Sequence, residues 1–162
     1  MLVSGNCRKS KCTIFYFLFK FFNSLNLSRR IKNAKTEDEK TNYEEIHYLM
    51  RQRANGTVQF IGELYKVDML NVGIMLKCIN RLLHFATEES IECVCKLLTT
   101  VGKKLEKDPN LKNYYAKMDK NDKPFPQCMN ILQHFSTKQS KVILTSRIRF
   151  EIQNVIDLRR DG

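Results

Sequence analysis

The sequence predicts an all-α fold built from stacked antiparallel helix pairs. Its 162 residues include no Trp, three Pro and six Gly, a composition that suits a helical domain better than a β-sandwich. Three consecutive segments carry apolar residues at helical spacing, and only short linkers separate them. Because such wide apolar stripes must be buried against neighbouring helices, stacked pairs are the expected arrangement.

The three stripes lie between residues 58 and 101 and should form the centre of the core. The first stripe consists of Val58, Ile61, Leu64 and Tyr65. The second consists of Met75, Cys78, Ile79, Leu82, Leu83 and Ala86. The third consists of Ile91, Val94, Cys95, Leu98 and Val101.

A charged helix is expected to precede the first stripe. Thr36 and Glu39 have the spacing of a capping box, which marks a helix start. Asn55-Gly56 is compatible with a turn, but neither flank alternates with a period of two. We therefore expect a helix that is continuous or kinked at Gly56 rather than a hairpin. Its early apolar face holds Tyr43, Ile46 and Met50.

Capping residues place the next two helices. Asn71 is a good N-cap for a helix ending near Phe85, and Thr87 for a helix reaching about Leu105. Asp108-Pro109 then ends the second of these helices.

The last third of the chain predicts three more helices. A short helix runs from Leu111 to Met118, and residues 120–126 form a loop whose Pro126 suits the first turn of the next helix. After a polar break at 136–140, the last helix runs from about Thr145 to Arg159. The inward residues of these last two helices are Cys128, Ile131, Leu132 and Phe135, then Ile148, Ile152, Val155 and Ile156.

Positive charge is concentrated at the two ends of the chain. The net charge is +8 in residues 1–36, −3 in residues 37–100 and +6 in residues 101–162, which gives the total of +11. Most of the basicity therefore lies outside the expected centre of the fold. Within the folded region, the C-terminal half is the better candidate for binding phosphate or acidic partners.

Residues 1–35 combine basic residues with an aromatic run at 14–22. Lys20 interrupts the run, which is shorter than the ~20 residues that span a bilayer. Three interpretations stay open: a non-homologous and disordered extension, a membrane-surface or partner-binding helix, or a signal or anchor segment.

We find no catalytic constellation in the sequence. His47, His84 and His134 are isolated, and no zinc-protease, nucleophile-elbow or phosphate-loop motif is present. Glu63 is interpreted as a surface or helix-packing carboxylate, and the six cysteines as reduced thiols rather than a disulfide or metal framework. We therefore expect no enzyme activity, no catalytic residues, no cofactor and no metal.

The last helix and the segment before it form the best candidate functional surface. With residues 148, 152, 155 and 156 inward, Arg147, Phe150 and Asn154 should point away from the core. An exposed Phe beside guanidinium groups suits a protein-binding hot spot. The alternative is a solvated basic face on which Phe150 packs against a further helix.

The order of several motifs closely resembles the middle domain of eukaryotic translation initiation factor 4 gamma. They are Phe-Ile-Gly-Glu-Leu-Tyr-Lys at 60–66, the run from Glu88 to Lys103, Ser-Arg-Ile-Arg-Phe at 146–150 and Val-Ile-Asp-Leu-Arg at 155–159. The resemblance covers residues 54–158 and only the later part of that domain. It implies a partial HEAT-type α-solenoid in residues 36–162, with 1–35 as an unrelated extension.

The resemblance also implies a cytoplasmic scaffold in translation initiation that binds a DEAD-box RNA helicase, with mRNA and other initiation factors as further partners. The helicase contact carries over to Arg147, Arg149 and Phe150, and the basic candidates for RNA are Lys138, Lys141, Arg159 and Arg160. The family's N-terminal helicase contact has no counterpart in this sequence, which predicts weaker binding. The alternatives are a non-specific RNA-binding module, or a truncated product that competes with the full scaffold or has no function.

Overall fold

The computed structural model describes residues 37–137 and 144–161, and all regular structure in these residues is α-helical. Its helices are α2 (Glu37–Lys66), α3 (Val72–Phe85), α4 (Glu88–Glu106), α5 (Leu111–Tyr115), α6 (Phe125–Ser136) and α7 (Ser146–Arg160). The predicted all-α class and helix order are confirmed. The predictions for Thr36, the aromatic run at 14–22, Lys138 and Lys141 lie outside the described residues.

The chain divides into two compact units, Met1–Thr57 and Val58–Gly162. Within the first unit, residues 37–57 belong to α2, where Thr57 Oγ1 donates a hydrogen bond to the Arg53 carbonyl at 2.8 Å. The helix passes through Gly56 without a turn, as the lack of strand periodicity predicts.

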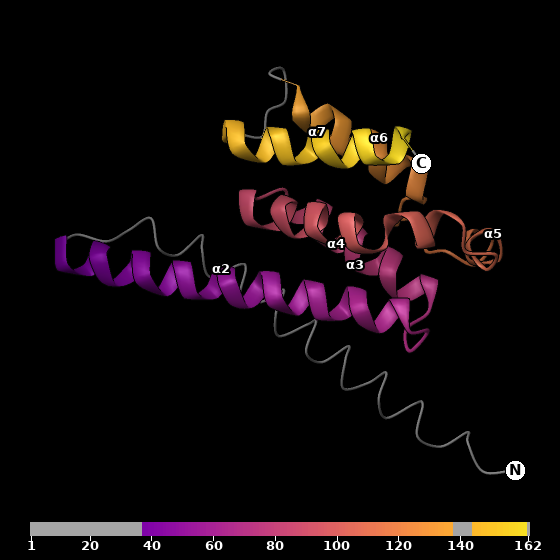
Figure 1. Cartoon of the computed structure of the whole chain (residues 1–162), viewed down its shortest axis with the longest axis horizontal. Helices are drawn as coiled ribbons and strands as arrows, with labels where there is room; N and C mark the ends of the chain where they lie inside the picture. Colours follow the sequence, from indigo (N-terminus) through magenta and orange to yellow (C-terminus); the bar gives the residue numbers. More distant parts are fainter. Residues whose placement is uncertain (1–36, 138–143, 162) are drawn as a thin grey trace, which may run out of the picture. The chain divides into compact units, whose positions relative to one another are not determined.

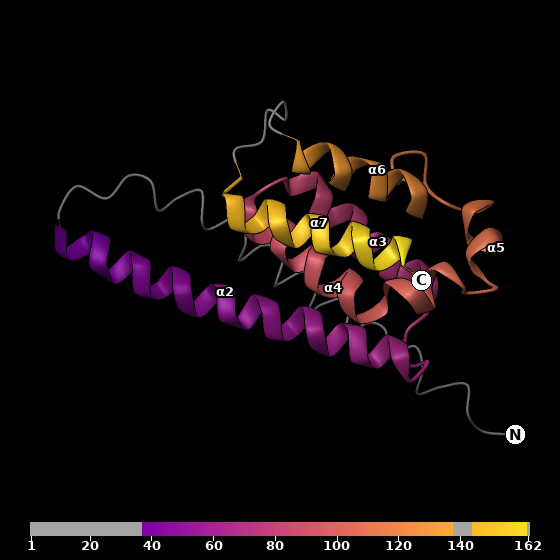
Figure 2. The same cartoon turned by 45° about the horizontal axis from the view of Figure 1, so that its top comes forward.

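The second unit is a stack of helix pairs (Figure 1). Helix α3 packs against α4 and α6 against α7, and the two pairs meet through the α4–α7 and α3–α6 contacts. Figure 2 shows α7 running beside α4, with α6 on its other side and α5 at one end of the stack. This layering of antiparallel pairs is the HEAT-type arrangement that the sequence predicts.

Side chains cap the starts of α3 and α4 as predicted. The Ile74 amide donates to Asn71 Oδ1 at 2.9 Å. Thr87 and Ser90 form a reciprocal capping box, in which each backbone amide donates to the other's hydroxyl at 3.0 and 3.2 Å. Between these helices Ala86 adopts a left-handed φ of 49°, which lets the chain reverse within two residues.

The core is centred on α4, which contacts neighbours on several sides. Gly62 brings the end of α2 close to α4, because a Cβ at that position would lie 3.0 Å from Thr100 Cγ2. The predicted stripe of α4 is buried, and the segment between Ser90 and Cys95 is buried all round. The sequence stripe thus identifies one buried face of α4 but not its full burial.

Candidate interaction surface on helix α7

Helix α7 holds its inner face firmly against α4 and α6. Ile148 and Ile152 are fully buried, and Val155 is nearly so. At the helix start, Thr145 Oγ1 donates to Glu88 Oε1 on α4 at 2.7 Å. Three of the four predicted inward residues are thus confirmed, whereas Ile156 is only half-buried, and the buried face fixes which side of α7 is open to a partner.

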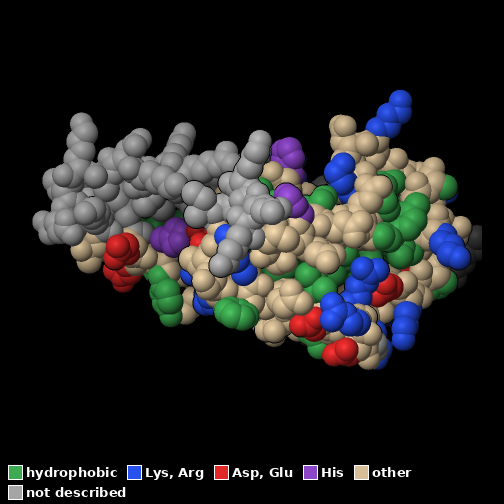
Figure 3. Space-filling view, turned by 90° about the horizontal axis from the view of Figure 1, so that it is seen from above, with side chains coloured by type: hydrophobic (Ala, Val, Ile, Leu, Met, Phe, Trp, Pro, Cys, Tyr) green, Lys and Arg blue, Asp and Glu red, His purple; other side chains and the backbone are tan. Residues whose placement is uncertain are grey.

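Phe150 lies on the outer side of α7 and is 70% exposed. It exposes a larger fraction of its surface than any other large apolar side chain in the described residues. Figure 3 shows hydrophobic side chains interspersed with Lys and Arg on the face seen from above. A solvated Phe on a rigid helix loses little conformational entropy when it binds, so it suits an anchor for a protein partner.

Arg147 reaches from α7 to a buried carboxylate on α4. Its guanidinium nitrogens lie 3.4 Å from each carboxylate oxygen of Glu92, and Nη1 also lies 2.7 Å from Glu151 Oε1. We expected Arg147 to point away from the core. It reaches back instead, because the side chain of Glu92 is only 6% exposed and a buried charge needs a partner of opposite sign.

Arg149 is half-buried beside Phe150. Its Nε is shielded and has no hydrogen-bond partner in the described part of the chain. Two of the three residues predicted for the helicase contact therefore differ in environment: Phe150 presents a ring to solvent, whereas Arg149 is partly packed.

The two arginines at the end of α7 are also in different environments. Arg159 Nε and Nη2 both donate to Glu106 Oε1, at 3.0 and 2.8 Å, and its guanidinium lies 5.6 Å from the centre of the Phe125 ring. The Arg160 side chain is 71% exposed and lies 3.6 Å from Asp157 Oδ1. The structure thus pairs one of the proposed RNA-binding arginines with α4 and leaves the other at the surface.

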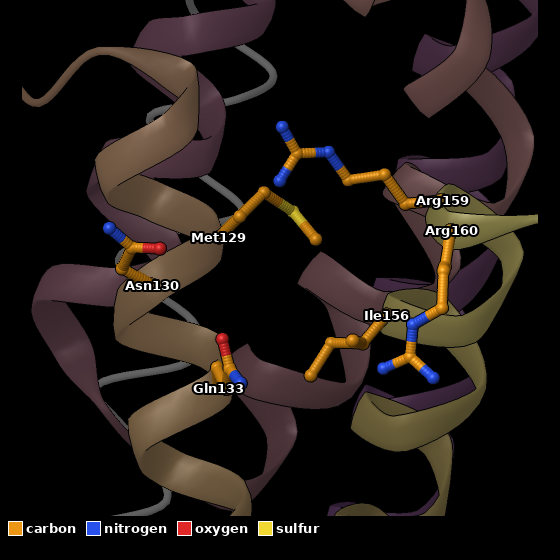
Figure 4. A pocket seen from close by; sticks show the side chains of 6 residues that line it. All are labelled: Met129, Asn130, Gln133, Ile156, Arg159 and Arg160. Atoms are coloured by element: carbon orange, nitrogen blue, oxygen red, sulfur yellow. The ribbon is translucent and has the colours of Figure 1, made fainter. Parts of the chain in front are cut away.

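A hollow of about 260 Å³ separates α6 from α7 near these arginines. In Figure 4, Met129 and Ile156 point toward each other across it, while Arg159 and Arg160 extend along its edges. No periodicity in a sequence shows where two packed helices leave a gap, so this hollow could not be predicted.

The described cysteines occupy core positions. Burial raises the pKa of the Cys78 thiol to about 12. Burial, together with the nearby carboxylates of Glu151 and Glu92, raises the pKa of Cys95 to about 12. Such thiols stay protonated at neutral pH and are poor nucleophiles.

Three findings bear on other kinds of site. Within residues 37–137 and 144–161, no cluster of three His, Cys, Asp or Glu side chains could hold a metal ion. None of the helices described combines the length and apolar character needed to cross a bilayer. Glu63 is a surface carboxylate, paired with Lys66 at 2.9 Å, as the sequence predicts.

Comparison with known proteins finds one matching domain family and several relatives. The MIF4G domain family matches residues 16–162. Eukaryotic translation initiation factor 4 gamma 1 of Mus musculus is 37% identical over 141 residues, which cover 83% of this chain and 8% of that protein. The corresponding factor 4 gamma 3 of Homo sapiens is 37% identical over 138 residues, covering 81% and 8%. The factor 4 gamma of Dictyostelium discoideum is 36% identical over 129 residues, covering 77% and 8%.

Proposed function

We propose that this chain, which belongs to the MIF4G domain family, is a scaffold module of translation initiation that docks a DEAD-box RNA helicase. Its curated relatives are translation initiation factors by name. The chain spans 8% of the length of these relatives, so the proposal concerns one binding surface rather than the whole scaffold. The docking surface is the outer side of α7 around Phe150.

The observation that supports this surface most strongly is the exposure of Phe150 on a helix whose other side is buried. Phe150 is 70% exposed, while its neighbours Ile148 and Ile152 are fully buried. An aromatic anchor beside an arginine is the usual composition of an interface hot spot. Within the proposed site, Phe150 is the anchor, Arg149 its neighbour, and Arg147 holds α7 in place through Glu92.

The proposed mechanism is binding without chemistry. By binding one lobe of the helicase, the module would shift the equilibrium between the open and closed domain arrangements of the helicase. In this proposal the chain acts in the cytoplasm.

A pull-down with purified helicase tests this proposal. Phe150→Ala should weaken helicase binding by at least about tenfold in dissociation constant, because truncating a hot-spot residue costs about 2 kcal/mol or more, and helicase recovery should fall accordingly. Arg149→Glu combined with Phe150→Ala should abolish recovery. Phe60→Ala is the matched control, because Phe60 is also a largely exposed Phe, 61% accessible, but lies on α2. Equal recovery with wild type and both Phe150 variants would refute the proposal.

Non-specific RNA binding is the second candidate function, favoured by the net charge of +6 in residues 101–162. The proposed contacts are Lys138, Lys141, Arg159 and Arg160. A salt titration distinguishes the two functions. Binding through phosphates falls steeply as salt rises, whereas helicase docking through Phe150 should persist.

A further inference from the structure

A second, larger cleft lies between α4, α6 and α7, away from Phe150. Its volume is about 450 Å³, within the range of pockets that hold small ligands or single large side chains. Its apolar lining comes from all three helices: Leu98, Phe125, Met129, Val155 and Leu158. Leu158 is 57% exposed at the edge, so the cleft opens to solvent.

The glycine at position 102 of α4 leaves part of the cleft unfilled. A Cβ built at Gly102 would have Leu98 Cβ as its nearest neighbour, at 3.9 Å, which is an ordinary contact distance. A larger side chain would therefore fit the backbone here and would project into open space. Since α4 tolerates Ala or Leu better than Gly by about 1 kcal/mol, the glycine leaves a cavity at a cost in helix stability.

Basic side chains surround the apolar lining. Lys103, Lys107 and Arg159 line the cleft together with one acidic residue, Glu106. Arg159 and Glu106 form an ion pair at 2.8 Å, so their charges cancel. The two exposed lysines therefore give the cleft its net positive charge. The smaller hollow between α6 and α7 adjoins the cleft, because Met129 and Arg159 line both, and it adds Arg160 (Figure 4).

We infer that this cleft binds an acidic peptide segment of a partner protein, with one large apolar side chain in the cavity and carboxylates on Lys103 and Lys107. The apolar lining supplies the anchor pocket, and the lysines supply the charge complementarity. Single-stranded RNA fits less well, because base stacking requires an open aromatic face. The one aromatic ring of the lining, Phe125, is 2% exposed and has the Arg159 guanidinium over it.

Selection from a random 12-residue peptide library against the full chain tests this inference. Affinities of the selected peptides are then measured by fluorescence anisotropy for the wild type and four variants. Gly102→Leu fills the cavity, and Gly102→Ala is its matched control. Lys103→Glu with Lys107→Glu reverses the rim charge. Lys112→Glu with Lys117→Glu makes the same change of net charge at exposed positions outside the cleft.

The selected peptides should carry Asp or Glu on both sides of a Leu, Met or Phe. Gly102→Leu and the rim reversal should each weaken binding by about tenfold or more, with the controls within about twofold of wild type. Circular dichroism confirms that each variant keeps its helices. The rim reversal alters only exposed lysines, so it tests the cleft even if Gly102→Leu unfolds.

Several results would overturn the inference. No acidic enrichment in the selected peptides, or equal binding to wild type and Gly102→Leu, would show that the cleft is not the site. Binding of an oligouridylate that the rim reversal abolishes, without any acidic peptide, would assign the lysines to RNA. Light scattering that shows a wild-type dimer and a Gly102→Leu monomer would assign the cleft to self-association.

Discussion

Arg147 joins α7 to α4 through a carboxylate that has almost no access to water. Glu92 is 4% exposed as a residue, and its oxygens lie 3.4 Å from the Arg147 nitrogens. The guanidinium itself is about half exposed, so solvent screens part of this attraction. The pair therefore matters mainly because Arg147 offsets part of the cost of burying the Glu92 carboxylate.

Arg147→Ala should lower the free energy of unfolding by about 1–3 kcal/mol, less than a fully buried pair would because Arg147 is partly solvated. Urea unfolding measures this change. Adding Glu92→Gln should recover part of the loss, since it removes the buried charge. Arg160→Ala is the control and should cost less than about 0.5 kcal/mol, because the side chain is mostly exposed. If the Arg147 and Arg160 variants are equally stable, the pair is not structural.

Tyr65 and Asp108 form a hydrogen bond that couples stability to pH. Tyr65 OH donates to Asp108 Oδ2 at 2.6 Å. Burial, the hydrogen bond to Asp108 and the charges of Asp108 and Asp68 raise the pKa of Tyr65 above its ordinary value of 10.0. Burial alone would raise the pKa of Asp108, but hydrogen bonds from Tyr65 and Asn110 and the charge of Lys104 hold it below its ordinary value of 3.8.

Tyr65→Phe should therefore flatten both ends of the stability profile. The lowered pKa of Asp108 gives stability that is present above pH 3.8 and is lost as pH falls through the folded pKa. The raised pKa of Tyr65 gives stability that is present below pH 10.0 and is lost as pH rises toward the folded pKa. Urea midpoints at acidic, neutral and alkaline pH measure both effects. Tyr48→Phe, at an exposed tyrosine, should leave the profile unchanged, and identical profiles for wild type and Tyr65→Phe would contradict the coupling.

At the scale of elements, one glycine allows two helices to approach closely, and another leaves open space beside its helix. A Cβ at Gly73 on α3 would lie 2.5 Å from Tyr114 Cε2 on α5, whereas a Cβ at Gly102 meets nothing closer than 3.9 Å. The short α5 thus packs on α3 only because residue 73 has no side chain. The same residue type has opposite roles at the two positions.

Gly73→Ala should destabilise the fold by about 1–3 kcal/mol, because the Tyr114 ring must shift to admit the methyl group. In a Tyr114→Ala background the same substitution should cost much less, and thermal unfolding of the four proteins gives this coupling energy. Gly102→Ala, the matched control, should stabilise α4 by about 0.5–1 kcal/mol. Additive effects of the changes at 73 and 114 would show that the two residues do not meet.

At the scale of the whole molecule, buried cysteines report on the integrity of the stack. Cys78, Cys93, Cys95 and Cys128 lie on α3, α4 and α6, and all four are buried. A reagent can reach all of them together only when the helix pairs separate. Thiol reactivity is therefore a measure of global opening.

With Cys7 and Cys12 replaced by Ser, the four remaining thiols should react with a disulfide reagent only at the rate of unfolding. In denaturant all four should react at once, which the absorbance of the released thiolate measures. A loosely packed product without a stable core would instead expose them in native buffer. Rapid modification of any one of them without denaturant would contradict the burial of that residue.

The sequence by itself determined the order of the helices, the caps of α3 and α4 and the inner face of α7, whereas α5 ends at Tyr115, before the predicted Met118. Asn71, Thr87 and the stripe through Ile148 and Ile152 act over at most a few residues, so spacing alone identifies them. The exposure of Phe150 follows from that stripe, because residue 150 lies about 200° around the helix from the inward residue Ile148. The resemblance to the initiation factor family likewise rests on sequence alone.

Only the tertiary structure decided which helices pack together and where a cleft remains between them. The all-round burial of Ser90–Cys95, the pairing of Glu92 with Arg147 and the cleft beside Gly102 join residues that are far apart in the chain. No local pattern encodes such contacts, because the identity of the opposing side chain depends on how the pairs stack. The exposure of Phe150 thus depends on the pattern of one helix, whereas the basic cleft depends on how three helices pack.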